Sequence, residues 1–295
     1  MHVNGDPPYC GRFAPSPTGP LHLGSLIAAL ASYLDARYNA GTWLVRMEDL
    51  DPPREEQGAA RRILDSLQNH GLHWDGELLF QSQRHDAYAA ALQKLSDAGH
   101  LFHCDCTRQS LGPDGACQGN CRDRRGELRS PTAIRVSSPS PAHIEFVDQL
   151  QPDRYSASSA LPADFVVRRK DGLYAYQLAV VVDDEWQGVN HIVRGSDLMD
   201  STARQICLQQ LLGYQTPRYL HLPVITDRAG HKFSKQTHAP ALDDRQAAAN
   251  LRAALAFLHQ REPPPALHTS GDILHFACQH WMPRAIPAVM SIPAG

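Results

Sequence analysis

The chain lacks three features that would each indicate a particular class of protein. No apolar run approaches the roughly 20 residues that a membrane-spanning helix needs. The start, Met1 to Pro8, has neither the basic nor the apolar region of a signal peptide. Basic residues are not in excess, because 28 Lys and Arg stand against 31 Asp and Glu, which gives a formal net charge of −3. These absences argue against membrane insertion, secretion and bulk electrostatic attraction to nucleic acid. We therefore expect a soluble cytoplasmic protein.

Composition is otherwise that of a globular chain of about two domains. Of its 295 residues, 42% are hydrophobic and 20% are charged, and no internal repeat or low-complexity segment is apparent. Any RNA binding must come from local basic patches. One candidate patch contains Arg122, Arg124, Arg125 and Arg129, although such a cluster is also typical of a solvated loop.

Cysteine is too unevenly distributed for a secreted disulfide scaffold. Four of the seven cysteines lie in one short stretch, as Cys104-x-Cys106 and Cys117-x-x-x-Cys121. Two close pairs joined by a loop containing Gly and Pro are typical of a structural zinc site with four thiolate ligands. Unbound thiols or a disulfide are the alternatives. We predict one structural zinc ion per chain, and we interpret Cys10, Cys207 and Cys278 as surface or core residues.

The apolar pattern of the first hundred residues predicts alternating strands and helices. A β-branched run at 42–47 indicates a central parallel strand that ends at Glu48, where a ligand crevice is expected. Helical spacing follows at 53–70 and at 85–98. The alternation favours an α/β fold with a Rossmann-like parallel sheet.

The middle and end of the chain predict an insertion, a return to the sheet and a helical remnant. Strands are expected at 133–136 and 144–147, and a β-hairpin is expected from 165–169 and 178–182 around the turn at 170–172. Strands at 189–194 and 219–224 flank a helix at 201–212. A helix is expected at 244–259, and a loose Pro-rich end from Pro283. The predicted divisions are the first half of the Rossmann-like domain (1–102), a zinc-bearing α/β insertion (103–185), the second half of that domain (186–240) and a short helical C-terminal remnant (241–295).

Two segments far apart in the sequence carry residues suited to binding phosphate. From Arg12 the chain reads RFAPSPTGPLHLGSL, and from Lys232 it reads KFSKQ. The first leads a Pro- and Gly-containing loop into a helical stretch, so backbone N–H groups at the helix start can bind an anion. His22 adds a donor, Gly24 allows close approach of a flat adenine ring, and Lys235 supplies a mobile positive charge for a leaving pyrophosphate. Either segment alone is weak evidence, because KFSKQ by itself would be an ordinary exposed loop.

In this order, the two segments resemble the HIGH and KMSKS signatures of class I aminoacyl-tRNA synthetases, in the form found in the glutamate branch. Ser25 stands where the second histidine of HIGH falls. Four further segments match that branch, namely RMEDLD from Arg46, DGLYAYQLA from Asp171, the pair Asp183-Asp184, and RGSDL from Arg194. The resemblance covers residues 10–240.

Carried over by position, the resemblance implies a glutamate pocket and an ATP site. Arg12 and Arg194 would bind carboxylates, Glu48 the α-ammonium group, and Ser16 and Tyr176 would form neutral hydrogen bonds. The implied glutamate-binding set is Arg12, Ala14, Ser16, Glu48, Tyr176 and Arg194. The implied ATP-binding set, accompanied by Mg²⁺, is His22, Gly24, Ser25, Lys232 and Lys235, with His22 and Lys235 catalytic.

Each pocket residue also has a simpler interpretation. Without the motifs, Glu48 would be an ion-paired carboxylate at a strand end, and Tyr176 a half-buried strand aromatic. Arg194 would be a surface partner of Asp197. The coincidence of five such residues in matching motifs favours the binding interpretation.

The segment after Lys235 is shorter than the helical anticodon-binding region of a full glutamyl-tRNA synthetase. The chain therefore resembles the stand-alone paralogues that join glutamate to queuosine in the anticodon loop of tRNA(Asp). This implies an ATP-dependent ligase, expected to be a monomer, whose partners are ATP, L-glutamate and queuosine-bearing tRNA(Asp). Two alternatives are a truncated glutamyl-tRNA synthetase that charges a tRNA 3′ end, and a non-catalytic zinc-bearing RNA-binding module. Retention of Arg12, His22, Glu48, Arg194 and Lys235 disfavours the second.

Overall fold

The first strands of the chain form a parallel sheet around a crossover helix. In the computed structural model, β1 (Cys10–Phe13) pairs in parallel with β2 (Thr42–Met47), and β2 pairs in parallel with β3 (Leu79–Phe80). Helix α1 (Leu23–Tyr38) connects β1 to β2. The predicted strand at 42–47 is confirmed. The structure describes residues 7–119, 121–124, 128–138, 143–151, 159–160, 163–227 and 240–293.

The second parallel pair lies beside the first. Strands β9 (His191–Gly195) and β10 (Arg218–Leu222) pair in parallel and are joined by η4 (Ser196–Leu198) and α6 (Met199–Leu212). At the start of β9, Asn190 N donates to Cys10 O at 3.0 Å, and Cys10 N donates to Asn190 Oδ1 at 2.8 Å. The starts of β1 and β9, 180 residues apart in the sequence, therefore lie side by side. The prediction of an α/β fold with a parallel sheet is confirmed.

The helices of the first half differ from the prediction at one end. The predicted helix at 53–70 begins only at α2 (Ala59–Asn69), after the short η1 (Pro52–Arg54). Gly58 lies in the left-handed region at φ 75°, which interrupts a right-handed helix at that point. Helix α3 (His85–Asp97), which follows η2 (Gln81–Gln83), confirms the predicted helix at 85–98.

The segment predicted to be an insertion contains a three-stranded antiparallel sheet. Its strands are β4 (Leu101–Cys104), β5 (Ala133–Ser137) and β8 (Asp164–Arg168), with β5 in the centre. The cysteine-rich loop, with η3 (Arg108–Ser110), joins β4 to β5. A short antiparallel pair follows in β6 (His143–Ile144) and β7 (Ser159–Ala160).

The predicted hairpin after β8 is wrong in its second strand. The turn does reverse the chain, because Arg169 N donates to Leu173 O at 2.8 Å and Arg168 bridges Tyr174. The chain then enters α5 (Tyr176–Trp186) instead of a strand. Every residue from Leu178 to Asp184 is buried. A helix buried on all sides carries no helical polarity pattern, so its β-branched run looks like a buried strand.

The C-terminal segment adds two helices and a strand to the part of the molecule that contains α1 and β11 (Val224–Thr226). After η6 (Asp244–Gln246), α7 (Ala247–Phe257) largely confirms the helix predicted at 244–259. Helix α8 (Ser270–Gln279) was not predicted, and both helices pack on α1 in one hydrophobic core. The expected loose end is wrong. After η7 (Pro283–Ala285), β12 (Ser291–Pro293) pairs in parallel with β11.

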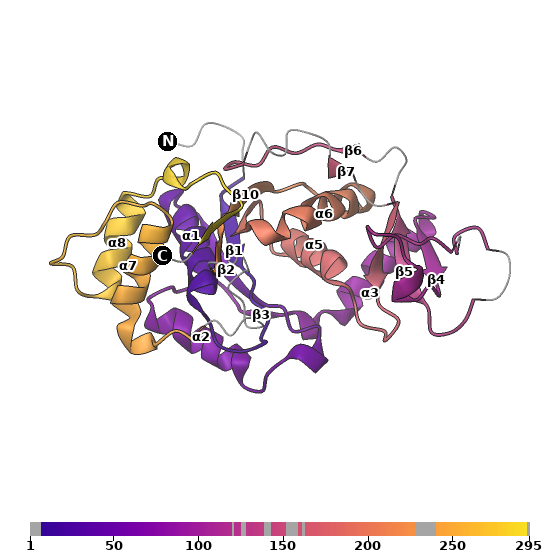
Figure 1. The fold of residues 1–295 in the computed structure, drawn as a ribbon, viewed down its shortest axis with the longest axis horizontal. Helices are drawn as coiled ribbons and strands as arrows, with labels where there is room; N and C mark the ends of the chain where they lie inside the picture. Colours follow the sequence, from indigo (N-terminus) through magenta and orange to yellow (C-terminus); the bar gives the residue numbers. More distant parts are fainter. Residues whose placement is uncertain are drawn as a thin grey trace.

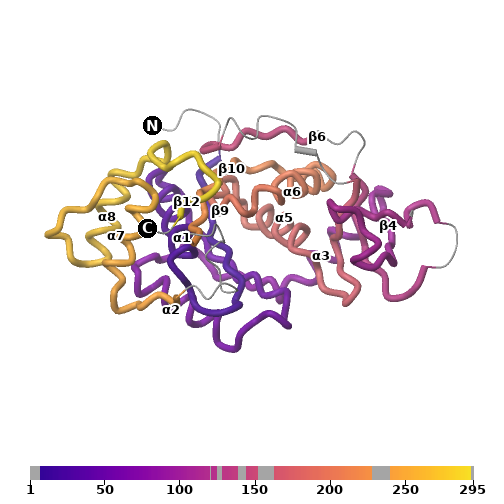
Figure 2. The backbone as a smooth tube through the Cα atoms, viewed as in Figure 1, coloured from indigo at the N-terminus to yellow at the C-terminus, as the bar shows by residue number. Residues whose placement is uncertain are grey.

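The elements form an elongated molecule (Figure 1). The sheet of β4 and β5 lies at one end, α7 and α8 lie at the other, and α5 and α6 lie between, where they share a second hydrophobic core with α3. Figure 2 traces the C-terminal segment, in yellow, from α8 back to β12 near the parallel strands. Among the helices that the structure describes, none combines the length and apolarity needed to cross a membrane.

Candidate active site

A cavity of about 900 Å³ lies at the carboxyl ends of β1, β2, β9 and β10. Parallel strands present ligand-binding residues at this edge. Nine of the predicted site residues line the cavity, and they are Arg12, Ala14, Ser16, His22, Gly24, Ser25, Glu48, Tyr176 and Arg194. Lys232 and Lys235 lie outside the described residues. The fold therefore brings together every predicted glutamate- and ATP-binding residue that it describes.

A second cavity, of about 950 Å³, adjoins the first. The two share Ser16, Glu48, Arg54 and Tyr176 as lining residues. The second cavity continues to Cys104 and to the basic side chains of the insertion. One groove therefore runs from the loop at residues 14–22, which is predicted to bind phosphate, to the cysteine cluster.

The loop at residues 14–22 ends in a histidine that caps helix α1. His22 is the N-cap of α1, and its Nδ1 accepts from Ser25 N at 3.3 Å. Because Nδ1 accepts, the proton of a neutral ring lies on Nε2, which is 3.1 Å from Ser25 Oγ. A Cβ at Gly24 would lie 3.1 Å from the His22 ring and 3.2 Å from Ile225 Cγ2. Because glycine has no Cβ, the imidazole of His22 packs against the backbone at this position without crowding. Ser25, at the position of the second HIGH histidine, thus holds the first.

A buried row of alternating charges forms the wall on the side of β1 and β2. Arg12 Nε donates to Asp184 Oδ1 at 3.1 Å, and Arg46 Nη2 lies 2.8 Å from the same oxygen. Burial would raise the pKa of Asp184, but Arg12 and Arg46 outweigh it and hold that pKa below its usual range. Within the described part of the chain, no hydrogen bond engages the terminal nitrogens of Arg12. They are available to a ligand carboxylate.

Glu48 is the last charged residue of this row, and its pKa is raised. Its Oε1 lies 3.6 Å from Arg46 Nη2, and its side chain is 10% exposed. Burial raises the pKa of Glu48 from its ordinary value of 4.5 to about 7, although Arg46 and Arg12 favour the charged form. A cationic ligand group beside Glu48 would compensate the buried negative charge.

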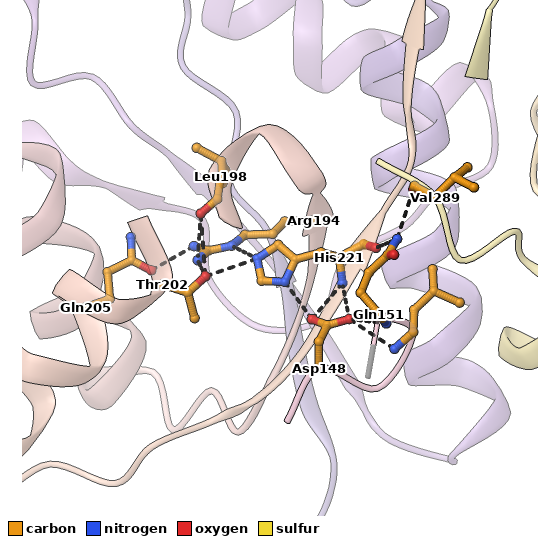
Figure 3. A network of polar contacts seen from close by, with 9 residues as sticks. Asp148, Gln151, Arg194, Leu198, Thr202, Gln205, His221 and Val289 are labelled. Atoms are coloured by element: carbon orange, nitrogen blue, oxygen red, sulfur yellow. Dashed lines mark hydrogen bonds and ion pairs between the residues drawn. The ribbon is translucent and has the colours of Figure 1, made fainter. Parts of the chain in front are cut away.

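Arg194 forms the opposite wall and is only 4% exposed, which excludes the interpretation as a surface residue. Its guanidinium donates to neutral acceptors, as Figure 3 shows. The shorter contacts are to Gln205 Oε1 at 2.8 Å, Thr202 Oγ1 at 2.9 Å and His221 Nε2 at 3.0 Å. The longer ones are to Leu198 O at 3.4 Å and Tyr176 Oη at 3.5 Å. No carboxylate among the described residues pairs with Arg194, so its charge is left for a ligand.

Sequence reasoning missed the residues that hold Arg194. Thr202 and Gln205 lie on α6, and His221 lies on β10. His221 Nδ1 is 2.6 Å from Asp148 Oδ2, and all four residues are buried. None belongs to a recognisable motif, and 73 residues separate Asp148 from His221. Only the fold could identify them.

The cysteine cluster at the far end of the groove fits a tetrahedral metal site. The Sγ atoms of Cys104, Cys106, Cys117 and Cys121 all lie within 4.8 Å of one another. Those of Cys117 and Cys121 are each 3.6 Å from Cys106 Sγ, and all four cysteines are free. Ligands about 2.3 Å from a tetrahedral zinc ion lie about 3.8 Å apart. The four thiols could therefore hold a metal ion.

Asp105 supports the cysteine loop. Its carboxylate accepts from Cys121 Sγ at 3.3 Å and from Arg129 N at 3.0 Å, and it pairs with Arg124 at 2.8 Å. Lys170 Nζ donates to the Asp105 carbonyl at 2.8 Å. Two members of the predicted basic patch therefore brace the cluster, while Arg125 lies outside the described residues.

The sequence pattern of the tRNA synthetases class I (E and Q), catalytic domain, matches residues 10–127 and 116–257. The chain belongs to this family. Relatives named glutamyl-Q tRNA(Asp) synthetase include one from Pseudomonas fluorescens, 49% identical over 97% of this chain and 96% of its own length. Another, from Pseudomonas aeruginosa, is 49% identical over 97% of both chains. These relatives bear out the resemblance to stand-alone class I synthetase-type ligases.

Solved structures show the same synthetase fold. Glutamate-tRNA synthetase from Elizabethkingia anophelis superposes with a TM-score of 0.79 at 21% identity, covering 98% of this chain and 68% of that one. A glutamate tRNA ligase from Elizabethkingia meningosepticum, solved in complex with its amino acid, gives 0.79 at 22% identity over 97% and 67%. The class I synthetase fold predicted from the sequence is therefore confirmed.

Proposed function

We propose that this synthetase activates L-glutamate with ATP and transfers the glutamyl group to the queuosine base of tRNA(Asp). The observation that carries the proposal is one cavity lined by two buried arginines, a carboxyl group that is only 10% exposed, and the loop predicted to bind phosphate. Glutamate has two carboxylates and one ammonium group, and this set matches them in charge. The names of the relatives support the choice of RNA acceptor.

In the proposed first step, a glutamate carboxylate oxygen attacks the α-phosphorus of ATP, and pyrophosphate leaves. Arg12 and Arg194 orient the carboxylates, Glu48 binds the ammonium group, and Ala14, Ser16 and Tyr176 complete the pocket. His22, Gly24 and Ser25, with Lys232 and Lys235, bind the nucleotide, which Mg²⁺ accompanies. His22 and Lys235 stabilise the charge that develops on the phosphates.

In the second step, a hydroxyl of the modified base attacks the carbonyl carbon of glutamyl-adenylate, and AMP leaves. The groove from Glu48 to the insertion would receive the anticodon loop, since RNA loops present splayed bases. Arg108 and Lys170 line that groove and offer positive charge to the backbone. We further propose that Cys104, Cys106, Cys117 and Cys121 hold one zinc ion that stabilises the insertion.

Labelled glutamate distinguishes the acceptors. Transfer should occur to tRNA(Asp) that carries queuosine and not to the same tRNA without it, and the label should remain with the anticodon-loop fragment after cleavage. Equal labelling of both RNAs, or label at the 3′ end of tRNA(Glu), would identify a truncated glutamyl-tRNA synthetase instead. Because its substrates are cytoplasmic, we propose that location, and size-exclusion chromatography would test the expected monomer.

The activation step has its own test. Among a panel of amino acids, glutamate should support ATP–pyrophosphate exchange without any tRNA, because all pocket residues belong to one chain. Exchange that requires tRNA, or that prefers glutamine or aspartate, would contradict the proposed pocket.

A further inference from the structure

We propose that Asp148 and His221 are positioning residues that orient Arg194 for binding a glutamate carboxylate. The inference rests on the proposed function, because it takes Arg194 to be a carboxylate-binding residue. Figure 3 shows the three side chains in a row, with His221 between the other two. They come from three different parts of the chain: the insertion segment, β10 and β9.

Hydrogen-bond chemistry fixes the state of His221. A guanidinium has only donors, so His221 Nε2, 3.0 Å from Arg194 Nε, must present its lone pair. The proton therefore lies on Nδ1 and is donated to Asp148 Oδ2 at 2.6 Å. Burial lowers the pKa of His221 despite Asp148, which keeps the ring neutral. The ring is thus held in a single tautomer by the acid behind it.

Asp148 is itself fixed by the backbone. Its Oδ1 accepts from the backbone N–H groups of Leu150 at 3.0 Å and of Gln151 at 2.9 Å. The backbone N–H of His221 lies 3.2 Å from Oδ2. Gln151 Nε2 in turn donates to Val289 O at 2.9 Å, so the C-terminal segment closes this network. These contacts fix the position of the Asp148 carboxylate, which in turn fixes the orientation of the His221 ring.

A neutral acceptor suits an arginine that must bind an anion. Arg12 contacts Asp184 directly and shares its charge with a fixed carboxylate. Arg194 is separated from Asp148 by the neutral ring of His221. The ring fixes the direction of Arg194 Nε–H through a hydrogen bond and does not neutralise the positive charge of the guanidinium. Its two longest contacts, to Tyr176 Oη at 3.5 Å and Leu198 O at 3.4 Å, are on the two terminal nitrogens. A ligand carboxylate could displace these contacts while Nε remains held.

Two substitutions at His221 separate positioning from packing. The amide of glutamine can reach the place of Nε2 and accept from Arg194, whereas the shorter asparagine reaches only the place of Nδ1 and Asp148. In ATP–pyrophosphate exchange, His221→Asn should raise the KM for glutamate about tenfold, as expected for a lost bond to a charged group. The KM for ATP should not change. His221→Gln should recover most of the loss, because it restores the acceptor.

Asp148→Asn provides an independent test. In this variant the asparagine carbonyl oxygen accepts from the backbone amides of Leu150 and Gln151, so its NH₂ group faces His221 Nδ1. Because NH₂ only donates, His221 must carry its proton on Nε2 instead, and Nε2–H then meets the donor Arg194 Nε–H. The KM for glutamate should rise at least as much as in His221→Asn. The same change in a His221→Gln background should add little, because no imidazole is left to switch.

Controls distinguish the possible failures. His70 is also buried, with Nδ1 2.7 Å from Ser66 O and Nε2 3.1 Å from Asn250 Nδ2, so His70→Asn tests the loss of a buried histidine elsewhere. It should lower the melting temperature without changing the KM for glutamate. Equal KM values for His221→Asn and His221→Gln would overturn the positioning role. If Arg194→Ala left glutamate binding intact, the proposed role of Arg194 itself would be wrong.

Discussion

Replacing Glu48 by glutamine should make the protein more stable at pH 8 while weakening glutamate binding. The pKa of Glu48 is raised by burial from 4.5 to about 7, so the folded state binds this proton more tightly than the unfolded chain. The free energy of unfolding therefore falls as the pH rises from about 4.5 to about 7, and this contribution is constant at higher pH.

The size of the effect follows from the same values. A pKa that moves from 4.5 to about 7 corresponds to about 3 kcal/mol. Glutamine resembles the protonated acid in shape and charge, so Glu48→Gln should gain up to about 3 kcal/mol at pH 8 but less than about 1 kcal/mol at pH 5. Urea denaturation of both proteins at the two pH values measures this difference.

Ligand binding should show the reverse trend. The ammonium group of glutamate needs a charged Glu48, so below about pH 7 binding must first remove a proton. The KM for glutamate should then rise about tenfold for each pH unit below 7 and level off above it. In Glu48→Gln the KM should be high and independent of pH, which controls for other titrating groups in the cavity.

Two results would refute the reasoning. One is a parent KM for glutamate that stays constant between pH 6 and 8. The other is a Glu48→Gln variant that loses stability equally at pH 5 and pH 8, which would mean that Glu48 stabilises the fold as an ion pair with Arg46.

Three other predictions address the parts of the chain around this pocket. Metal analysis should find one zinc ion per chain, and Cys106→Ser should lose it while the control Cys207→Ser retains it; equal zinc in both would exclude the four-thiol site. Lys235→Ala should lower the rate of pyrophosphate exchange about a hundredfold with little change in the KM for glutamate, and an unchanged rate would make the segment an ordinary loop. Removal of residues 288–295 should lower both stability and exchange rate, because Val224 N loses its acceptor, Met290 O, at 3.0 Å; a fully active truncated protein would show that β12 is dispensable.

The sequence by itself identified the residues that meet at the cavity. Loop, strand and motif signals are local, and residues such as Arg12, His22 and Glu48 carry their chemistry within a few neighbouring positions. The parallel sheet then brings strand ends to a common edge, so motif residues from β1, β2 and β9 line the same cavity. The two close cysteine pairs could also be recognised from the sequence, because short spacing limits how far apart the thiols of each pair can lie.

Local patterns failed where burial or distant contacts decided the structure. The valine run of α5 is buried on all sides, so it reads as a strand, and α8 and β12 depend on packing against α1 and β11. The raised pKa of Glu48 depends on how little water reaches it. The row from Asp148 through His221 to Arg194 exists only because the insertion segment returns to β10. Sequence thus determined which groups are present, while tertiary packing decided their protonation, orientation and support, because these depend on neighbours that are distant in the chain.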